Sequence, residues 1–273
     1  MSNVNLQNIL SQRPRGLALD IDGTLSPIAP TPDQAQLYPG IASLLQQARE
    51  YAHIAIMTGR AIDDGAAMVN VDGLIYIGSH GLEWSIGLPS THPVHVTPEA
   101  MAYIQPGTIL LDLAEQKLAP SLPGLIVERK RIGGSIHYRL CSDPEKTRHM
   151  ILSLLEEPAR RVNMWLAQGK QVIEVRTPLA VNKGQALSWF ASHFGLRSII
   201  FAGDDRTDLD AVLEVARLRQ QGLAAFAIAV EHNDTPPTLL EHADLVVQGV
   251  EGMAELLRQI VACMASNASE RSL

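Results

Sequence analysis

The chain has 273 residues, of which 46% are hydrophobic and 19% charged, so it is long enough to bury a substantial core and too apolar to be disordered. Its formal net charge of −7 argues against general binding to nucleic acids, whose phosphates require a basic surface. Cys141 and Cys263 are its only cysteines, which provide neither a disulfide framework nor a metal cluster and fit a reducing compartment.

The distribution of apolar residues bears on the cellular location of the protein. No apolar run is long enough to span a membrane, and residues 1–15 lack the basic start and apolar core of a secretory signal. Residues 265–273 are small and polar, which predicts a frayed end. We therefore expect a cytoplasmic protein that does not bind a membrane.

Strand-like apolar runs alternate with amphipathic helices through most of the chain. The expected strands are residues 17–19, 54–57, 74–77, 199–202, 225–230 and 245–247. The expected helices lie around residues 41–48, from residue 184, and over residues 209–216, where apolar side chains recur at helical spacing. This alternation predicts an α/β core built on a parallel sheet with helices on both faces.

The pattern changes between about residue 98 and residue 178. A helix expected over 99–118 is followed by extended runs at 125–130 and 135–140, a helix from Asp143-Pro144 to about Pro158, and a hairpin of 162–167 with 171–176. This order of elements predicts a small α+β insert. We expect the domains to be a first core part at 1–98, the insert at 99–179 and a second core part at 180–273.

Two aspartates follow the first expected strand, where residues 16–26 read Gly-Leu-Ala-Leu-Asp-Ile-Asp-Gly-Thr-Leu-Ser and Gly23 marks a turn. Because side chains two apart on an extended segment point the same way, Asp20 and Asp22 leave the sheet edge together. Carboxylates that close repel each other unless a proton or a cation lies between them. An oxygen-rich site open to substrate is typical of Mg²⁺, and a strand that simply ends in a polar turn is the alternative.

Three more polar clusters follow other expected strands or begin a helix: Thr58, Lys183, and Asp204 with Asp205 and Asp208. Ligands of open α/β sheets bind at the carboxyl ends of the strands, so these clusters can converge. Taken alone, Thr58 fits a turn, Lys183 a solvated helix lysine, and the paired aspartates helix caps. Together with the first two aspartates they supply the nucleophile, proton carrier, neutral donor, cation and metal carboxylate that phosphoryl transfer needs.

The motifs of competing chemistries are missing from the sequence. It contains no G-x-G-x-x-G, no G-x-x-x-x-G-K-[ST], no H-E-x-x-H and no G-x-S-x-G. Its nine histidines lack the spacing of metal ligands, which argues against a zinc site.

Four segments, in order, resemble the motifs of the haloacid-dehalogenase superfamily of phosphatases. They are residues 20–25 (Asp-Ile-Asp-Gly-Thr-Leu), 58–60 (Thr-Gly-Arg), 183–184 (Lys-Gly) and 203–208 (Gly-Asp-Asp-Arg-Thr-Asp). Within that superfamily, residues 78–83, 128–130, 137–139 and 174–176 resemble trehalose-6-phosphate phosphatases. The resemblance extends over about residues 15–250 and implies a Rossmann-like parallel-sheet core with an inserted α/β cap.

The resemblance implies roles for the residues after the first strand. Asp20 would be the nucleophile and form an aspartyl-phosphate, while Asp22 would protonate the leaving sugar oxygen and then deprotonate the attacking water. Mg²⁺ would be held by the Asp20 carboxylate, the Asp22 backbone carbonyl and Asp204. Thr24 and Arg60 lie beside these groups in sequence motifs and would shape the loop.

The remaining core residues would serve the phosphate and the metal. Thr58 and Lys183 would bind phosphate oxygens, and the lysine charge would offset the negative charge around the nucleophile. Asp205 and Asp208 would support the metal shell or orient Lys183.

The resemblance also implies a set of residues that bind the sugar. His80 and Glu83 would contact it from the core, and Glu128, Lys130 and Glu174 from the cap, which would close over the sugar and exclude water. Ordinary surface ion pairing is the alternative for the three cap residues.

Two departures from the family pattern bear on the sugar rather than on the chemistry. Thr177 separates Arg176 from Pro178, where the family usually has proline directly after the basic residue, and Leu209 and Val212 replace an acidic and aromatic pair.

The function implied is a Mg²⁺-dependent phosphatase of a small sugar phosphate, trehalose 6-phosphate. Sucrose 6-phosphate or a glycosylated phosphoglycerate are the alternative substrates, and a catalytically silent sugar-phosphate sensor is the alternative function. The sequence leaves the oligomeric state open.

Overall fold

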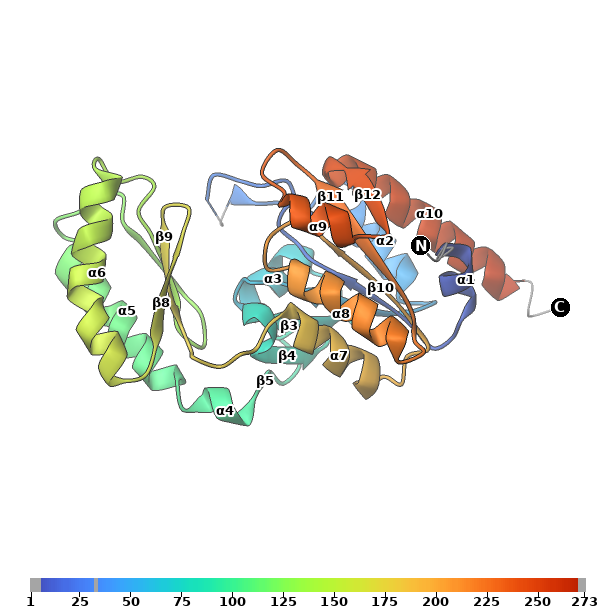
Figure 1. Cartoon of the computed structure of the whole chain (residues 1–273), viewed down its shortest axis with the longest axis horizontal. Coiled ribbons are helices and arrows are strands. Elements are labelled where there is room, and N and C mark those ends of the chain that lie inside the picture. Colours follow the sequence, from blue (N-terminus) through green and yellow to red (C-terminus); the bar gives the residue numbers. More distant parts are fainter. Residues whose placement is uncertain (1–5, 32–33, 270–273) are drawn as a thin grey trace. The chain divides into compact units, whose positions relative to one another are not determined.

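The computed structural model describes residues 6–31 and 34–269 (Figure 1). It divides into two compact units, one made of Met1–His95 with Val181–Leu273 and the other of Val96–Ala180. We call the first the core unit and the second the inserted unit, and describe each by itself.

The core unit is built on an eight-stranded sheet. In spatial order its strands are β12 (Leu245–Gln248), β11 (Ala224–Glu231), β10 (Ser198–Gly203), β1 (Arg15–Leu19), β2 (His53–Met57), β3 (Ile75–Gly78), β4 (Glu83–Ile86) and β5 (His95–Val96). Neighbouring strands from β12 to β3 are parallel, and β4 is antiparallel to β3. The predicted parallel α/β sheet is therefore confirmed, with an antiparallel edge that the sequence analysis did not predict.

The central strands are buried on both faces. Leu17 and Leu19 of β1 pack into one apolar cluster and Ala18 into another, because successive side chains of a strand point to opposite faces. The first cluster is covered by α1 (Leu6–Ser11), α2 (Ile41–Ala48), α3 (Ile62–Val69) and α10 (Gly249–Ser269), and the second by α7 (Lys183–His193), α8 (Leu209–Gln220) and α9 (Pro237–His242). Burial on both faces explains why these strands appear in the sequence as continuous apolar runs.

Strand β1 lies where the order of the sheet reverses. β2 and β3 follow on one side of it, and β10, β11 and β12 on the other. Ligands of open α/β sheets bind at such a point, outside the carboxyl ends of the strands. The residues that follow β1 and β10 are therefore placed where a ligand is expected.

The inserted unit has a four-stranded antiparallel sheet with its two long helices on one face (Figure 1). Its strands, in spatial order, are β6 (Ile126–Arg129), β7 (Gly134–His137), β9 (Val172–Arg176) and β8 (Trp165–Gly169), and its helices are α4 (Pro98–Met101), α5 (Ile104–Leu118) and α6 (Pro144–Arg161). Ile136, Ile173 and Val175 point toward α5 and α6 and share one buried cluster with them. The residues that alternate with these three lie on the opposite face of the sheet.

Helix α6 begins as predicted and ends later. The Asp143 side chain accepts a hydrogen bond from the Lys146 N–H and caps the helix. The end expected near Pro158 is wrong, since α6 continues to Arg161 with the proline inside it. The proline removes one backbone hydrogen bond in the last turn, but Ala159 beyond it is buried against the sheet and keeps the chain helical.

Two other expected elements of the inserted unit have different bounds. The helix expected over 99–118 is two helices, α4 and α5, interrupted at residues 102–103. The strand expected over 162–167 begins at Trp165, because Asn163 adopts a left-handed backbone (φ 53°) in the turn that ends α6.

The segment expected to be frayed begins within a helix. Helix α10 extends through Ser269, and its residues Leu257, Ile260 and Met264 are buried in the core cluster that it covers. The fraying expected from residue 265 stays a prediction. Residues 270–273, and residues 1–5 of the expected N-terminal segment, lie outside the described residues. No helix within the described ranges is both long and apolar enough to cross a membrane.

Candidate active site

Three segments that are distant in sequence bring their polar residues to the carboxyl ends of β1 and β10. Asp20 directly follows β1, and its N–H donates to the Ala202 carbonyl of β10 at 3.0 Å. Asp204 directly follows β10, and Lys183 is the first residue of α7. The parallel pairing of β1 with β10 therefore sets the distance between the two loops that carry the aspartates.

The Lys183 ammonium is buried between two carboxylates. Its Nζ lies 2.6 Å from Asp20 Oδ1 and 2.6 Å from Asp208 Oδ1, and none of the three side chains is more than 6% exposed. A lysine at the start of a helix is disfavoured by the helix dipole. Burial by itself would lower the pKa of Lys183, but Asp20 and Asp208 outweigh it and raise that pKa above its usual value.

The carboxylates around this lysine form an acidic cluster. Asp20, Asp204 and Asp208 each place an oxygen within 4.8 Å of the others, and all three are buried. When ionised they face the Lys183 ammonium with two negative charges in excess. Burial raises the pKa of Asp20 well above its usual value and that of Asp204 to about 8, because the charge is incompletely compensated. An all-oxygen donor set with this excess of charge fits a hard divalent cation such as Mg²⁺.

Asp208 and Asp205 have different tasks in the loop after β10. Asp208 Oδ2 accepts the N–H groups of Asp204 and Asp205, both at 3.0 Å, while its other oxygen contacts Lys183. Asp205 Oδ1 accepts from the N–H and hydroxyl of Thr207 at 2.7 and 2.8 Å and from the Asp208 N–H at 3.1 Å. Of the two residues expected to orient Lys183, it is Asp208 that contacts it.

Gly23 allows the loop after β1 to approach the loop after β10. Its φ of 80° is left-handed, and a Cβ at this position would lie 2.0 Å from Asp204 Oδ2. The neighbouring Thr24 hydroxyl donates to Asp204 Oδ1 at 3.3 Å. The ring of His232, at the end of β11, bonds the Gly23 carbonyl at 2.5 Å. No motif surrounds this histidine, so nothing in the sequence predicts its contact with the loop.

Asp22 is paired with the arginine of the Thr-Gly-Arg segment. Arg60 Nε donates to Asp22 Oδ2 and its Nη2 to Oδ1, both at 2.6 Å. The Thr58 hydroxyl, which is buried, accepts the Arg60 N–H at 3.1 Å and retains its own proton to donate. Arg60 was expected only to shape the loop. Its contact with Asp22 is not predictable from a local pattern, because the two residues are 38 positions apart.

Glu83, for which a sugar contact was expected, has protein partners, and the sugar contact itself stays a prediction. This side chain is 0% exposed, and its Oε1 accepts the Ser79 hydroxyl at 2.8 Å and the Ile62 N–H at 3.3 Å. Through these bonds Glu83 holds the turn after β3 against the start of α3. His80 lies in that turn with a left-handed backbone (φ 59°), and its ring packs against Gly59.

The three residues expected to read the sugar from the cap belong to the inserted unit. Glu128 and Glu174 both pair with Ser135 and so lie in one row on the sheet face opposite α5 and α6. Glu128 Oε2 is 2.8 Å from His137 Nε2. Lys130 directly follows β6, and its N–H donates to the Gly133 carbonyl at 3.1 Å. Their contact with a sugar stays a prediction.

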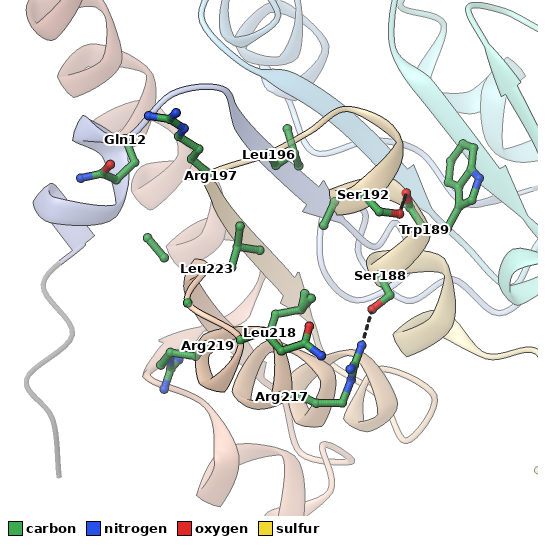
Figure 2. A pocket seen from close by; sticks show the side chains of 14 residues that line it. Gln12, Ser188, Trp189, Ser192, Leu196, Arg197, Arg217, Leu218, Arg219 and Leu223 are labelled. Carbon is green, nitrogen blue, oxygen red and sulfur yellow. Dashed lines mark hydrogen bonds between the residues drawn. The ribbon is translucent and has the colours of Figure 1, made fainter.

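The core unit also has a large cavity that is separate from the acidic cluster. A cavity of about 1000 Å³ is lined by the final turns of α7 and α8 and by the segments before β10 and β11, at the amino ends of these strands (Figure 2). Arg217 is engaged there with Glu214 and Ser188, and Arg219 with Asp244. Both arginines lie in the last turn of α8, where basic side chains offset the helix dipole. None of the predicted site residues lines this cavity.

Comparison with known proteins connects the acidic cluster with a family. A family model described as trehalose-phosphatase matches residues 18–239, a range that includes Asp20, Lys183, Asp204 and Asp208. The chain belongs to the trehalose-phosphatase family. The resemblance seen in the sequence motifs is thereby confirmed.

Relatives in this family match most of the chain. The trehalose-phosphate phosphatase of Mycobacterium marinum is 33% identical over 237 residues, which are 81% of this chain and 57% of that protein. A protein of Mycobacterium tuberculosis named an uncharacterized glycosyl hydrolase is 31% identical over 236 residues, 84% of this chain and 17% of that protein. The chain therefore spans little more than half of the phosphatase and a smaller part of the second relative.

Solved structures support the same fold. The crystal structure of a trehalose-6-phosphate phosphatase related protein superposes with a TM-score of 0.75 at 26% identity, covering 92% of this chain and 99% of the other. The C-terminal domain of the C. albicans trehalose-6-phosphate phosphatase has a TM-score of 0.69, covers 98% of this chain and 97% of its own, and is 18% identical, so it shows likeness of fold alone.

We predict that Glu83→Ala destabilises the protein by about 1–3 kcal/mol, because the Ser79 hydroxyl and the Ile62 N–H lose a buried acceptor. Denaturant unfolding followed by circular dichroism measures this change. Glu50→Ala, which removes an exposed carboxylate of the same unit, is the control and is expected to have little effect. An equal stability of the two variants would contradict the role given to Glu83.

Proposed function

We propose that this chain is a Mg²⁺-dependent phosphatase that hydrolyses trehalose 6-phosphate to trehalose and phosphate through an aspartyl-phosphate on Asp20. The observation that carries the proposal is the Lys183 ammonium, held 2.6 Å from both Asp20 and Asp208 in a buried cluster that includes Asp204. Phosphoryl transfer is catalysed mainly by positioning and by neutralisation of charge, and this cluster is arranged for both. Membership of the trehalose-phosphatase family supports the choice of substrate.

The divalent ion would be held by the Asp20 carboxylate, the Asp22 backbone carbonyl and Asp204. When bound, it supplies positive charge opposite the nucleophile and the phosphate oxygens. The excess negative charge of the acidic cluster and its all-oxygen donors support Mg²⁺ as that ion.

In the first half of the reaction, an Asp20 carboxylate oxygen attacks phosphorus and the bond from phosphorus to the sugar oxygen breaks. Asp22 gives its proton to that oxygen, so trehalose leaves as a neutral alcohol. Lys183 fixes the rotation of the Asp20 carboxylate through Oδ1 and opposes its protonation, which burial alone would favour. The Thr58 hydroxyl donates a hydrogen bond to a phosphate oxygen and keeps its proton.

In the second half, a water attacks the phosphorus of the aspartyl-phosphate and transfers a proton to Asp22. The bond from phosphorus to the Asp20 oxygen breaks, which frees phosphate and returns Asp20 to its ionised form. The proton that Asp22 gave to the sugar is thereby replaced, and the cycle closes.

The inserted unit would act as the cap of this enzyme and bind the sugar. Glu128 and Glu174 share one face of its sheet, and carboxylates accept hydrogen bonds from sugar hydroxyls while Lys130 donates them. We further propose that the partner is this small sugar phosphate rather than a nucleic acid or a membrane. A cytoplasmic location fits the free state of Cys141 and Cys263.

The substrate is tested with a panel of trehalose 6-phosphate, sucrose 6-phosphate, glucosyl-3-phosphoglycerate and glucose 6-phosphate in the presence of Mg²⁺. We expect trehalose 6-phosphate to have the highest kcat/KM, and Asp20→Asn to remove its turnover while the circular dichroism spectrum stays unchanged. A better substrate in the panel would contradict the sugar assignment. Considerable turnover by Asp20→Asn would contradict the covalent route, and tight binding without turnover of any phosphate would favour a sensor.

We predict that EDTA abolishes turnover, that Mg²⁺ restores it, and that the affinity for Mg²⁺ rises with pH up to about 8. Asp204 has a pKa of about 8 without metal, so it must lose a proton to bind the ion, and this loss is easier as the pH increases. For the same reason the metal-free protein loses stability between about pH 4 and pH 8, since the folded pKa lies above the unfolded one. Thermal unfolding with EDTA or Mg²⁺ at pH 6 and pH 8 measures both effects.

For this metal prediction, the increase in Tm on adding Mg²⁺ is expected to be larger at pH 8 than at pH 6, and to be lost in Asp204→Asn. An increase that is equal at the two pH values, or that survives in the variant, would place the ion elsewhere.

We predict that Glu174→Ala lowers kcat/KM for trehalose 6-phosphate by roughly 10-fold or more, as expected for loss of a hydrogen bond to a charged group. Hydrolysis of p-nitrophenyl phosphate, which has no sugar, is expected to change little. Glu157→Ala is the matched control, since Glu157 pairs with Arg160 and Arg161 on α6 of the same unit. Equal losses on the two substrates would mean that Glu174 does not read the sugar.

A further inference from the structure

The Asp22 carboxylate is held by a single side chain. Arg60 donates two parallel hydrogen bonds to it, from Nε to Oδ2 and from Nη2 to Oδ1, each 2.6 Å long. The Arg60 side chain is 12% exposed and that of Asp22 39%. Within residues 6–31 and 34–269, no other group bonds the Asp22 carboxylate, so its orientation depends on the arginine.

The backbone around Asp22 is fixed, but its side chain is not. The Leu25 and Ser26 N–H groups donate to the Ile21 carbonyl, and the Gly23 N–H donates to the Ser26 carbonyl at 2.7 Å. This closed turn sets the position of the Asp22 Cα. An aspartate that is more than a third exposed still rotates between rotamers unless a partner holds it.

Arg60, in contrast, is anchored on both sides. Its N–H donates to the Thr58 hydroxyl oxygen at 3.1 Å, and its carbonyl accepts the Ser79 N–H at 2.8 Å. The buried Glu83 carboxylate then ties Ser79 to Ile62, two residues after Arg60. The guanidinium is therefore carried by a segment that the core holds rigidly next to the end of β2.

We infer that Arg60 is a positioning residue that sets the orientation of the Asp22 carboxyl group for its two proton transfers, an inference that rests on the proposed function. A carboxylate has two lone pairs on each oxygen, and a guanidinium that binds it side-on uses one on each. The remaining lone pairs face away from Arg60 and are available for the proton that passes to the sugar oxygen and is recovered from water. Arg60 itself stays protonated throughout, so it adds no proton to the balance.

The fork shape of the guanidinium is what this role requires. Two bonds fix both the distance and the plane of the carboxylate, whereas a lysine ammonium is a point donor that leaves the plane free to rotate. Arg60→Lys therefore keeps the charge beside Asp22 and loses the orientation.

The test compares kcat/KM for phenyl phosphate and p-nitrophenyl phosphate, which are alike in shape but differ in leaving group. Phenolate is more basic than p-nitrophenolate, so it leaves more slowly when no acid protonates it. The value of kcat/KM reports the steps up to the breaking of the bond between phosphorus and the leaving oxygen. General acid catalysis contributes roughly 10²–10⁴-fold, so we expect Arg60→Ala to lose about tenfold more on phenyl phosphate than on p-nitrophenyl phosphate. Asp22→Asn is expected to show the same difference, and Asp22→Asn with Arg60→Ala to be no worse than Asp22→Asn alone.

Arg217→Ala is the matched control. Arg217 forms the same kind of two-bond contact with Glu214, and it lines the cavity at the amino ends of β10 and β11. We expect it to leave both kcat/KM values unchanged. Arg60→Lys, which retains the charge and most of the length, replaces Arg60→Ala if the alanine variant does not fold, and is expected to show the same selective loss.

The outcomes separate this inference from the proposed function. Equal losses on both substrates in the Arg60 variants, with a selective loss in Asp22→Asn, would overturn the role of Arg60. The role of Asp22 as the acid would stand. Such equal losses are expected if Arg60 binds phosphate directly. A loss in Asp22→Asn that is equal on both substrates would overturn the proton transfer itself, and the inference with it.

Discussion

One buried ammonium between two carboxylates holds the candidate active site together. Lys183 bonds Asp20 and Asp208, which are 163 and 25 residues away in sequence, and so joins the start of α7 to the loops after β1 and β10. Without it, three buried carboxylates would face one another without compensation, and removal of one partner from a buried ion pair is strongly destabilising. The carboxylates proposed for the chemistry are thus also a cost to folding, and the Lys183 ammonium offsets part of that cost.

This arrangement depends on close packing at some distance from the reacting groups. A Cβ on Gly16 of β1 would lie 2.4 Å from Leu196 and 2.8 Å from Phe190 of α7, so only glycine lets this helix lie so near the strand. The same helix carries Lys183 at its first residue. At the other end of β1, Gly23 clears the space that the Asp204 carboxylate occupies. The two glycines let the helix and both loops approach, and the parallel sheet sets their register.

Environment rather than residue type decides what each aspartate of the site does. Burial beside other carboxylates raises the pKa of Asp204 to about 8, which suits the metal ligand that we propose it to be. Asp208 is equally buried but bonds Lys183 and two backbone N–H groups, so it holds the loop. Asp205, between them in the motif, accepts the N–H groups of Thr207 and Asp208, just before α8 begins. Asp22, for which proton transfer is proposed, is more exposed than Asp20, Asp204 and Asp208, and Arg60 supplies the orientation that burial gives to those three.

The sequence by itself determined the α/β core and the order of its polar clusters, because alternating apolar runs and the residues that end them are local properties of the chain. It also placed Asp20, Lys183, Asp204 and Asp208 in motifs of a known family, which the family model matches. Only the tertiary structure decided that Arg60 bonds Asp22, that Glu83 is buried against Ser79, and that α6 continues past Pro158. Each of these depends on which distant segments meet and on how much side-chain surface they bury, and a local pattern carries no information about either.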